Sequence, residues 1–133
     1  MSRFSGIAAA VAAVLAITLW PGSSPTRYPV AGTALEPAAT ATVTVDPRPA
    51  GVAITVHIKG LPPSTADTHY AVWLRGAAGT VPVGSFHWRK SGEPVDLWSG
   101  VDPSRYPTFF VTRQHEGAPP TPSTETVLQG TLT

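Results

Sequence analysis

Four histidines are the side chains of this chain best suited to metal binding or proton transfer: His57, His69, His87 and His115. None of them belongs to an H-x-x-x-H pair, and the chain contains no cysteine, so no local zinc-ligand set exists. A site built in space from two histidines stays open as an alternative. We predict His57 on an outward strand face, the other three in turns or at strand ends, and neither a metal nor a cofactor.

Local motifs for nucleophilic catalysis and phosphate binding are also missing. The sequence contains no G-x-S-x-G elbow, no G-x-G-x-x-G fingerprint and no P-loop. Asp67, Glu93, Asp96 and Asp102 fall in or beside expected turns, where solubility and turn hydrogen bonds explain them. We therefore predict no catalytic residues and no enzymatic activity.

Aromatic side chains offer a different kind of site. His87 and Trp88 precede a polar turn and Trp98 follows it, so the three could form an exposed binding platform. A tryptophan at a strand end can instead cover the edge of its own core. Both interpretations stay open, and His87, Trp88 and Trp98 are the candidate binding residues.

The amino-terminal segment indicates where these residues work. Phe4 to Trp20 run without a charge directly behind Arg3, which predicts either a membrane anchor with its amino terminus inside or a cleaved secretion signal. We expect residues 1–3 to be a cytoplasmic stub and residues 4–20 the anchor or signal. Residues 21–38, rich in Pro, Gly and Ser, are predicted to form a stalk, and residues 39–133 an extracytoplasmic domain.

Charge does not select the partner. The chain contains nine Lys and Arg residues and eight Asp and Glu residues. Without Arg3, the rest of the chain carries eight basic and eight acidic residues. This balance provides no positive field, and we predict no nucleic-acid binding.

Alternating apolar and polar residues predict seven strands behind the anchor. The expected strands cover residues 40–45, 52–59, 70–75, 81–88, 95–98, 108–113 and 126–132. Their number and their Pro- and Gly-marked turns favour an all-β, immunoglobulin-like sandwich. Trp73 and Leu74, on a strand apolar on both faces, are predicted to fill the core, and Gly84 to mark a bulge or a close backbone approach.

The order of these segments carries a family resemblance. Gly60-Leu61-Pro62-Pro63 is followed by Tyr70-Ala71-Val72-Trp73-Leu74, then by Val83-Gly84-Ser85-Phe86, Phe110-Val111-Thr112 and Val127-Leu128-Gln129-Gly130-Thr131-Leu132. Over residues 35–133 this order resembles the extracytoplasmic domain of the anti-sigma-K factor family. In the family's late E-P-x-G-x-x-x-P-T loop, the acidic residue and the glycine are displaced here.

The resemblance implies a single-pass membrane protein whose cytoplasmic domain holds a sigma factor. Only Met1, Ser2 and Arg3 precede the apolar segment, so we expect the outer domain alone and no direct sigma-factor contact. The expected function is a membrane-anchored, non-catalytic interaction or sensor domain that contacts an envelope protein or a protease and regulates sigma-factor-dependent transcription through that partner. The alternative is a secreted sandwich that binds a small ligand or sugar through surface aromatics.

Overall fold

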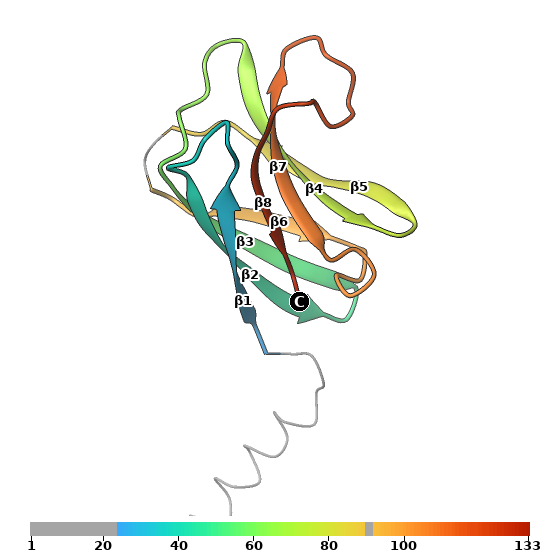
Figure 1. The fold of residues 1–133 in the computed structure, drawn as a ribbon. Helices are drawn as coiled ribbons and strands as arrows, with labels where there is room; N and C mark the ends of the chain where they lie inside the picture. Colours follow the sequence, from blue (N-terminus) through green and yellow to red (C-terminus); the bar gives the residue numbers. More distant parts are fainter. Residues whose placement is uncertain (1–23, 90–91) are drawn as a thin grey trace, which may run out of the picture.

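The computed structural model describes residues 24–89 and 92–133; the predicted stub and the anchor or signal segment lie outside these ranges. The described residues fold into eight strands, which confirms the all-β prediction (Figure 1). The strands are β1 (Thr26–Gly32), β2 (Thr40–Arg48), β3 (Gly51–Lys59), β4 (Thr68–Gly76), β5 (Gly79–Phe86), β6 (Val95–Ser99), β7 (Thr108–His115) and β8 (Thr126–Thr131). Within these ranges, no helix is long and apolar enough to cross a membrane.

All eight strands belong to one antiparallel sheet with the order β5-β4-β7-β8-β1-β2-β3-β6. The sheet curls until its edge strands β5 and β6 come together, where a Cβ atom on Gly84 would lie 2.7 Å from Leu97 Cδ2. The predicted two-sheet sandwich is not confirmed. The reason is β1, which pairs with β8 on one side and β2 on the other and so joins the two halves into one sheet.

Strand β1 also corrects the predicted stalk. Thr26–Gly32 lies inside residues 21–38, yet six of its residues pair with β2 and Val30 is only 3% exposed. The stalk prediction is therefore wrong for this stretch, and the folded domain begins before residue 39. Pro29 concealed the strand, because a proline inside an apolar run argues against a paired strand.

The seven strands expected from alternation are all present. The β2–β3 hairpin keeps a continuous register from Thr40↔Lys59 to Arg48↔Gly51, so its turn is shorter than the sequence predicted. Gly51 has a φ of 148°, a backbone conformation that favours glycine. Strand β4, the one that is apolar on both faces, lies between β5 and β7.

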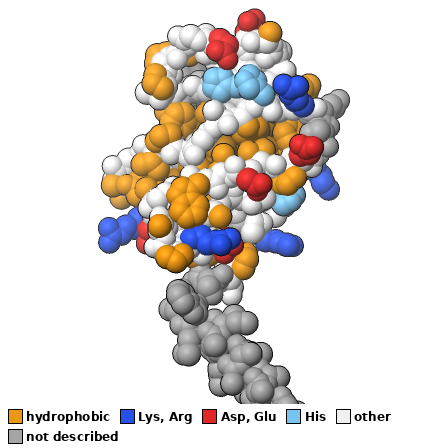
Figure 2. Space-filling view, turned by 180° about the vertical axis from the view of Figure 1, so that it is seen from behind, with side chains coloured by type: hydrophobic (Ala, Val, Ile, Leu, Met, Phe, Trp, Pro, Cys, Tyr) orange, Lys and Arg blue, Asp and Glu red, His pale blue; other side chains and the backbone are white. Residues whose placement is uncertain are grey.

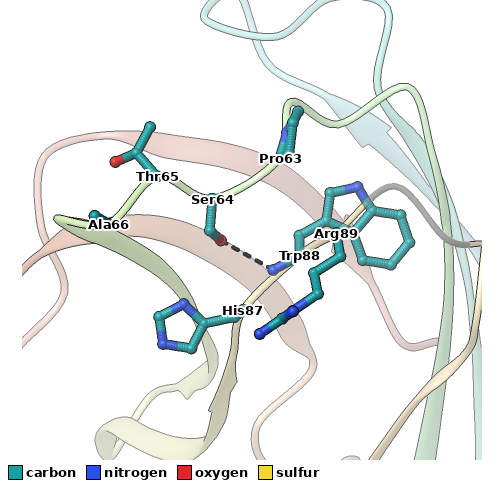
Figure 3. Close-up of a pocket in the computed structure, with 7 residues that line it drawn as sticks. All are labelled: Pro63, Ser64, Thr65, Ala66, His87, Trp88 and Arg89. Atoms are coloured by element: carbon teal, nitrogen blue, oxygen red, sulfur yellow. Dashed lines mark hydrogen bonds between the residues drawn. The ribbon is translucent and has the colours of Figure 1, made fainter.

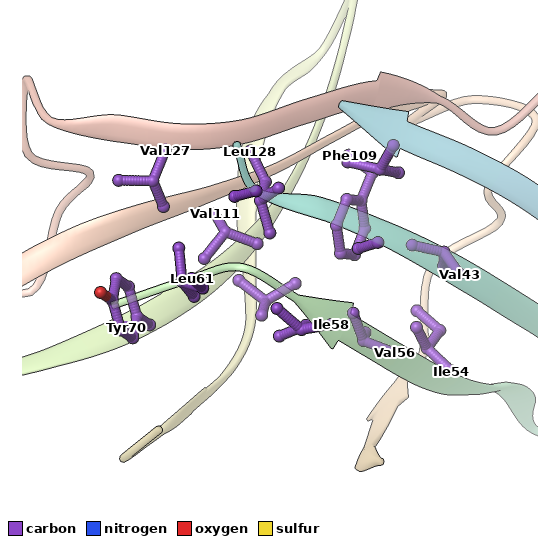
Figure 4. Packing of buried hydrophobic residues seen from close by; sticks show 14 of the residues in the cluster. Val43, Ile54, Val56, Ile58, Leu61, Tyr70, Phe109, Val111, Val127 and Leu128 are labelled. Carbon is purple, nitrogen blue, oxygen red and sulfur yellow. The ribbon is translucent and has the colours of Figure 1, made fainter. Parts of the chain in front are cut away.

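The core fills the inside of the curled sheet with alternate side chains of every long strand (Figure 4). Its largest fully buried members are Phe109, Ile54, Leu74, Leu128, Val43, Val56, Val72, Val111 and Val127. Because side chains alternate between the two faces of a strand, Val72 and Leu74 place the intervening Trp73 on the outer face. Trp73 is buried there against Ala71 and Phe110 in a second, smaller core cluster. Trp73 and Leu74 are both core residues as predicted, but only Leu74 lies inside the curled sheet.

Gly84 behaves as the sequence predicted. Val72 pairs with Gly84 while Trp73 pairs with Pro82, which leaves one extra residue in β5 and defines a bulge. Gly84 also approaches β6 closely, because a Cβ atom at this position would require the Leu97 side chain to shift.

Candidate binding site at the loop end of the sheet

Three connections meet beside the β1–β2 turn at one end of the sheet, which we call the loop end: residues 60–67, residues 87–89 after β5, and residues 116–125 (Figure 1). The first two enclose a hollow of about 450 Å³ (Figure 3). It is lined by Pro63, Ser64, Thr65, Ala66, His87, Trp88 and Arg89. The hollow contains two of the predicted binding residues.

Trp88 ties the two connections together. Its backbone N–H donates to Ser64 Oγ at 2.9 Å, and its carbonyl accepts the Ser64 N–H at 2.8 Å (Figure 3). Its indole Nε1 donates to the Leu61 carbonyl at 3.0 Å, and the side chain is 5% exposed. Trp88 therefore closes the edge of the core, and its predicted role as a surface aromatic is wrong.

His87 and Arg89, on either side of Trp88, are exposed. The imidazole of His87 lies 6.0 Å from that of His69 in β4, measured between ring centroids. His69 Nδ1 in turn lies 3.6 Å from Glu116 Oε1 in the third connection. His87 thus links the hollow to His69 of β4 and, through it, to the third connection.

Trp98 is not part of this site. It pairs with Ala53 near the beginning of β3, whereas Trp88 lies beyond the end of β3. Trp98 is 49% exposed, one of two large hydrophobic side chains exposed to this degree among the described residues. The predicted platform of two tryptophans is therefore wrong, although the exposure of Trp98 agrees with it.

A partly buried ionic network fixes the base of the 116–125 connection. Arg113 pairs with Glu36 of the β1–β2 turn and, at 3.3 Å, with Glu125. His115 Nε2 lies 2.6 Å from Glu125 Oε2. The hydrogen bond from His115 lowers the pKa of Glu125 below its ordinary value, and the one from Arg113 adds to this effect against partial desolvation. These contacts join β1, β7 and β8 at the loop end.

Tyr70 supports the same end from inside the core. Its hydroxyl donates to the Pro62 carbonyl at 2.7 Å, which fixes the 60–67 connection. Burial raises the pKa of this hydroxyl and keeps it protonated as a donor. The ring stacks on Phe86 at 5.7 Å between centroids, so β4, β5 and the connection form one rigid support.

A second hollow, which sequence reasoning missed, lies on the outer face of β4 and β5. It has a volume of about 300 Å³ and is lined by His69, Ala71, Val72, Trp73, Pro82, Gly84, Ser85, Gln114 and Pro120. Trp73 Nε1 donates to Thr112 Oγ1 at 2.9 Å, and Thr112 donates to Gln114 Oε1 at 2.7 Å. The sequence did contain a signal for this hollow, namely the strand β4, because a strand that is apolar on both faces needs other residues packed against both faces.

The remaining histidines lie where they were predicted. His57 is exposed on β3, and His115 ends β7. In residues 24–89 and 92–133, no group of three or more His, Asp or Glu side chains is arranged to hold a metal ion.

Comparison with known proteins identifies the family. The family described as "Anti-sigma-K factor rskA, C-terminal" matches residues 5–127. The chain belongs to this family. No curated protein and no solved structure matches it.

Membership confirms the resemblance drawn from the strand motifs and gives the chain a regulatory domain of the anti-sigma-factor type. The match begins inside the apolar segment at residue 5 and ends in β8, so it includes both hollows and all three connections of the loop end. In this anti-sigma-K domain, the Gly-Leu-Pro-Pro segment that carried the resemblance is the connection fixed by Tyr70 and Trp88.

Proposed function

We propose that this chain is a membrane-anchored, extracytoplasmic regulatory domain that acts by contacting another envelope protein. The observation that carries the proposal is the extent of the family match, which covers residues 5–20 of the apolar segment together with the β domain. A segment of this kind matched as one unit with the domain behind it is consistent with a helix that holds the domain at the cytoplasmic membrane.

The loop end is the surface proposed to meet the partner. It lies opposite the end at which β1 begins, and so faces away from the proposed anchor (Figure 1). Loops on a rigid sheet are common positions for recognition residues. Here His87 and Arg89 supply exposed polar groups, while Trp88 and Tyr70 fix the loops that carry them.

The proposed mode of action is binding without catalysis. The sequence contains no nucleophile or phosphate motif, and the family description is that of a regulator. Two acidic groups at the loop end, Glu36 and Glu125, are engaged in ion pairs with Arg113, and Glu116 Oε1 lies 3.6 Å from His69 Nδ1.

Cell fractionation tests the anchor. Full-length protein should remain in the membrane pellet after an alkaline carbonate wash, and a periplasm-dependent reporter fused behind Thr133 should be active. Deletion of residues 4–20 is the control and should abolish both pelleting and reporter activity. A shortened soluble form in the medium would overturn the anchored function in favour of a secreted protein.

Photo-cross-linking tests the partner surface. A photoreactive residue at position 87 should give a discrete adduct with an envelope protein in intact cells. The matched position is Thr42, which is also exposed but lies on a strand outside the loop end. Adducts from both positions, or from position 42 alone, would contradict the assignment of the loop end.

The outer-face hollow favours a second candidate function, the binding of a small ligand. Trp73 provides an aromatic wall, while His69, Ser85 and Gln114 provide polar groups at its rim. An aromatic wall with a few convergent polar groups suits a sugar ring or an aromatic acid. Titration with such compounds should shift the NMR signal of the Trp73 indole N–H; unchanged spectra at millimolar concentrations would exclude this function.

A further inference from the structure

Arginines gather at the end of the sheet opposite the loop end. This tether end consists of the beginning of β1, the turns at residues 49–50 and 77–78, and the connection 100–107. It carries the exposed side chains of Arg27, Arg48, Arg75 and Arg105. Figure 2 shows Lys and Arg side chains around the lower end of the domain.

Acidic side chains at the tether end are fewer than the arginines. Asp46 pairs with Arg48 at 2.8 Å, and Asp102 accepts the Ser104 N–H at 2.9 Å. Asp96 lies in the same row of paired strand residues as Arg27. Four positive and three negative side chains therefore give this end a surplus of one positive charge. The loop end has the opposite balance in the described residues, with Lys59, Arg89 and Arg113 against Glu36, Asp67, Glu93, Glu116 and Glu125.

Trp98 lies at the same end. It pairs with Ala53, one strand position from the end of β6, and its ring covers the β2–β3 turn: a Cβ atom on Gly51 would lie 2.9 Å from Trp98 Cζ2. Half-exposed tryptophan beside arginine is the composition found at membrane–water interfaces, where the ring sits at headgroup level.

The short tether limits how far this end can move from a membrane. Because β1 begins at Thr26, only residues 21–25 separate the apolar segment from the sheet. A fully extended chain spans at most about 3.5 Å per residue, so these five residues reach roughly 18 Å. The tether therefore keeps this end close enough to touch the membrane surface, where anionic lipid attracts arginines that come within about one Debye length, roughly 8 Å at physiological salt.

We propose that the tether end rests on the anionic lipid surface of the outer leaflet, with Trp98 at the interface and Arg27, Arg75 and Arg105 facing the phosphates. The inference rests on the membrane anchor of the proposed function. It adds a fixed orientation: with one end held against lipid, the loop end points into the envelope. The domain would not swing freely on a long stalk.

Tryptophan emission from the full chain tests the contact. The chain contains four tryptophans; Trp73 and Trp88 are buried, and replacing Trp20 by Phe leaves Trp98 as the exposed reporter. This variant is reconstituted into nanodiscs of phosphatidylglycerol or of phosphatidylcholine, with and without brominated acyl chains. Acrylamide accessibility provides a second readout that does not require penetration into the acyl region.

In phosphatidylglycerol we expect brominated lipid to quench Trp98 and acrylamide to reach it poorly. Both effects should weaken in phosphatidylcholine and at 1 M salt, where the Debye length falls to about 3 Å. The double substitution R27Q/R105Q should weaken docking by about fivefold per arginine. The matched double substitution K59Q/R89Q, which removes the same charge from the loop end, should leave Trp98 protected.

Adding Trp98→Phe should abolish the lipid-dependent signal, and circular dichroism confirms that each variant is folded. The inference is overturned if the reconstituted protein shows Trp98 equally accessible in both lipids and unaffected by R27Q/R105Q. Protection that is independent of lipid charge would assign Trp98 to a protein contact and would equally overturn it. Failure of the chain to enter nanodiscs or membranes would instead refute the anchor itself.

Discussion

Replacing Val30 by Ala measures whether β1 belongs to the folded domain. Val30 is 3% exposed and faces Ala41 of β2, and a Cβ atom on Gly130 of β8 would lie 2.9 Å from its Cγ2 atom. The substitution removes two buried methyl groups, about 1.6 kcal/mol at about 0.8 kcal/mol each. Incomplete collapse of the cavity adds roughly 0.5–1 kcal/mol. The free energy of unfolding should therefore fall by about 2–2.5 kcal/mol.

The assay is urea unfolding of residues 24–133, followed by the emission of buried Trp73 and Trp88. With a slope near about 1.5 kcal/mol per molar urea, the midpoint should fall by about 1.5 M. Arg27→Ala is the matched control, because Arg27 is exposed on the same strand, and should change stability by no more than about 0.5 kcal/mol.

Truncation provides a second view of the same prediction. Residues 39–133 lack β1 and leave β2 and β8 without their shared neighbour, so this fragment should lose cooperative unfolding. The reasoning is refuted if V30A shifts the midpoint no more than R27A and the fragment 39–133 unfolds like 24–133. Residues 26–32 would then act as a stalk.

Three further predictions concern packing and charge. Trp88→Phe leaves the buried carbonyl of Leu61 without its donor and should lower the free energy of unfolding by about 1–3 kcal/mol. Trp98→Phe, at an exposed position, should lower it by less than about 0.5 kcal/mol in detergent. Equal urea midpoints for the two variants would contradict the burial of Trp88. Gly76→Ala would drive a Cβ atom into a backbone carbonyl and should lower the melting temperature by several degrees, while Gly100→Ala, with open space around it, should not. The depressed pKa of Glu125 stabilises the fold above its unfolded pKa of about 4.5, and this contribution disappears as pH falls through the folded pKa. Glu125→Gln should therefore flatten the acid side of the stability–pH profile below about pH 5, and an unchanged profile would argue against the network.

The predicted strands were right where the evidence was local. Val52, Ile54, Val56 and Ile58 occupy every second position, and this period of two directly predicts the strand β3. The bulge at Gly84 was likewise visible, because a glycine inside a strand pattern typically marks a bulge or a close backbone approach.

The errors arose where the answer depends on a distant partner. Trp88 and Trp98 occupy similar positions beside the same turn in the sequence. In the structure, however, Trp88 donates a hydrogen bond to the carbonyl of Leu61, whereas Trp98 is exposed to solvent. Trp73 was expected to pack inside the fold, but its neighbours on β4 occupy the inner face and Trp73 is buried on the outer one.

The sequence by itself determined the all-β class, seven of the eight described strands and the family, since alternation and motif order are properties of contiguous residues. The tertiary structure alone decided the eighth strand, the curled single sheet and the unequal balance of positive and negative side chains at its two ends. Strand pairing joins residues far apart in the chain, as Thr26 joins Val45 and Ala31 joins Gln129. The sequence pattern of one strand does not indicate which other strand it pairs with, because the backbone hydrogen bonds between strands are the same for every side chain.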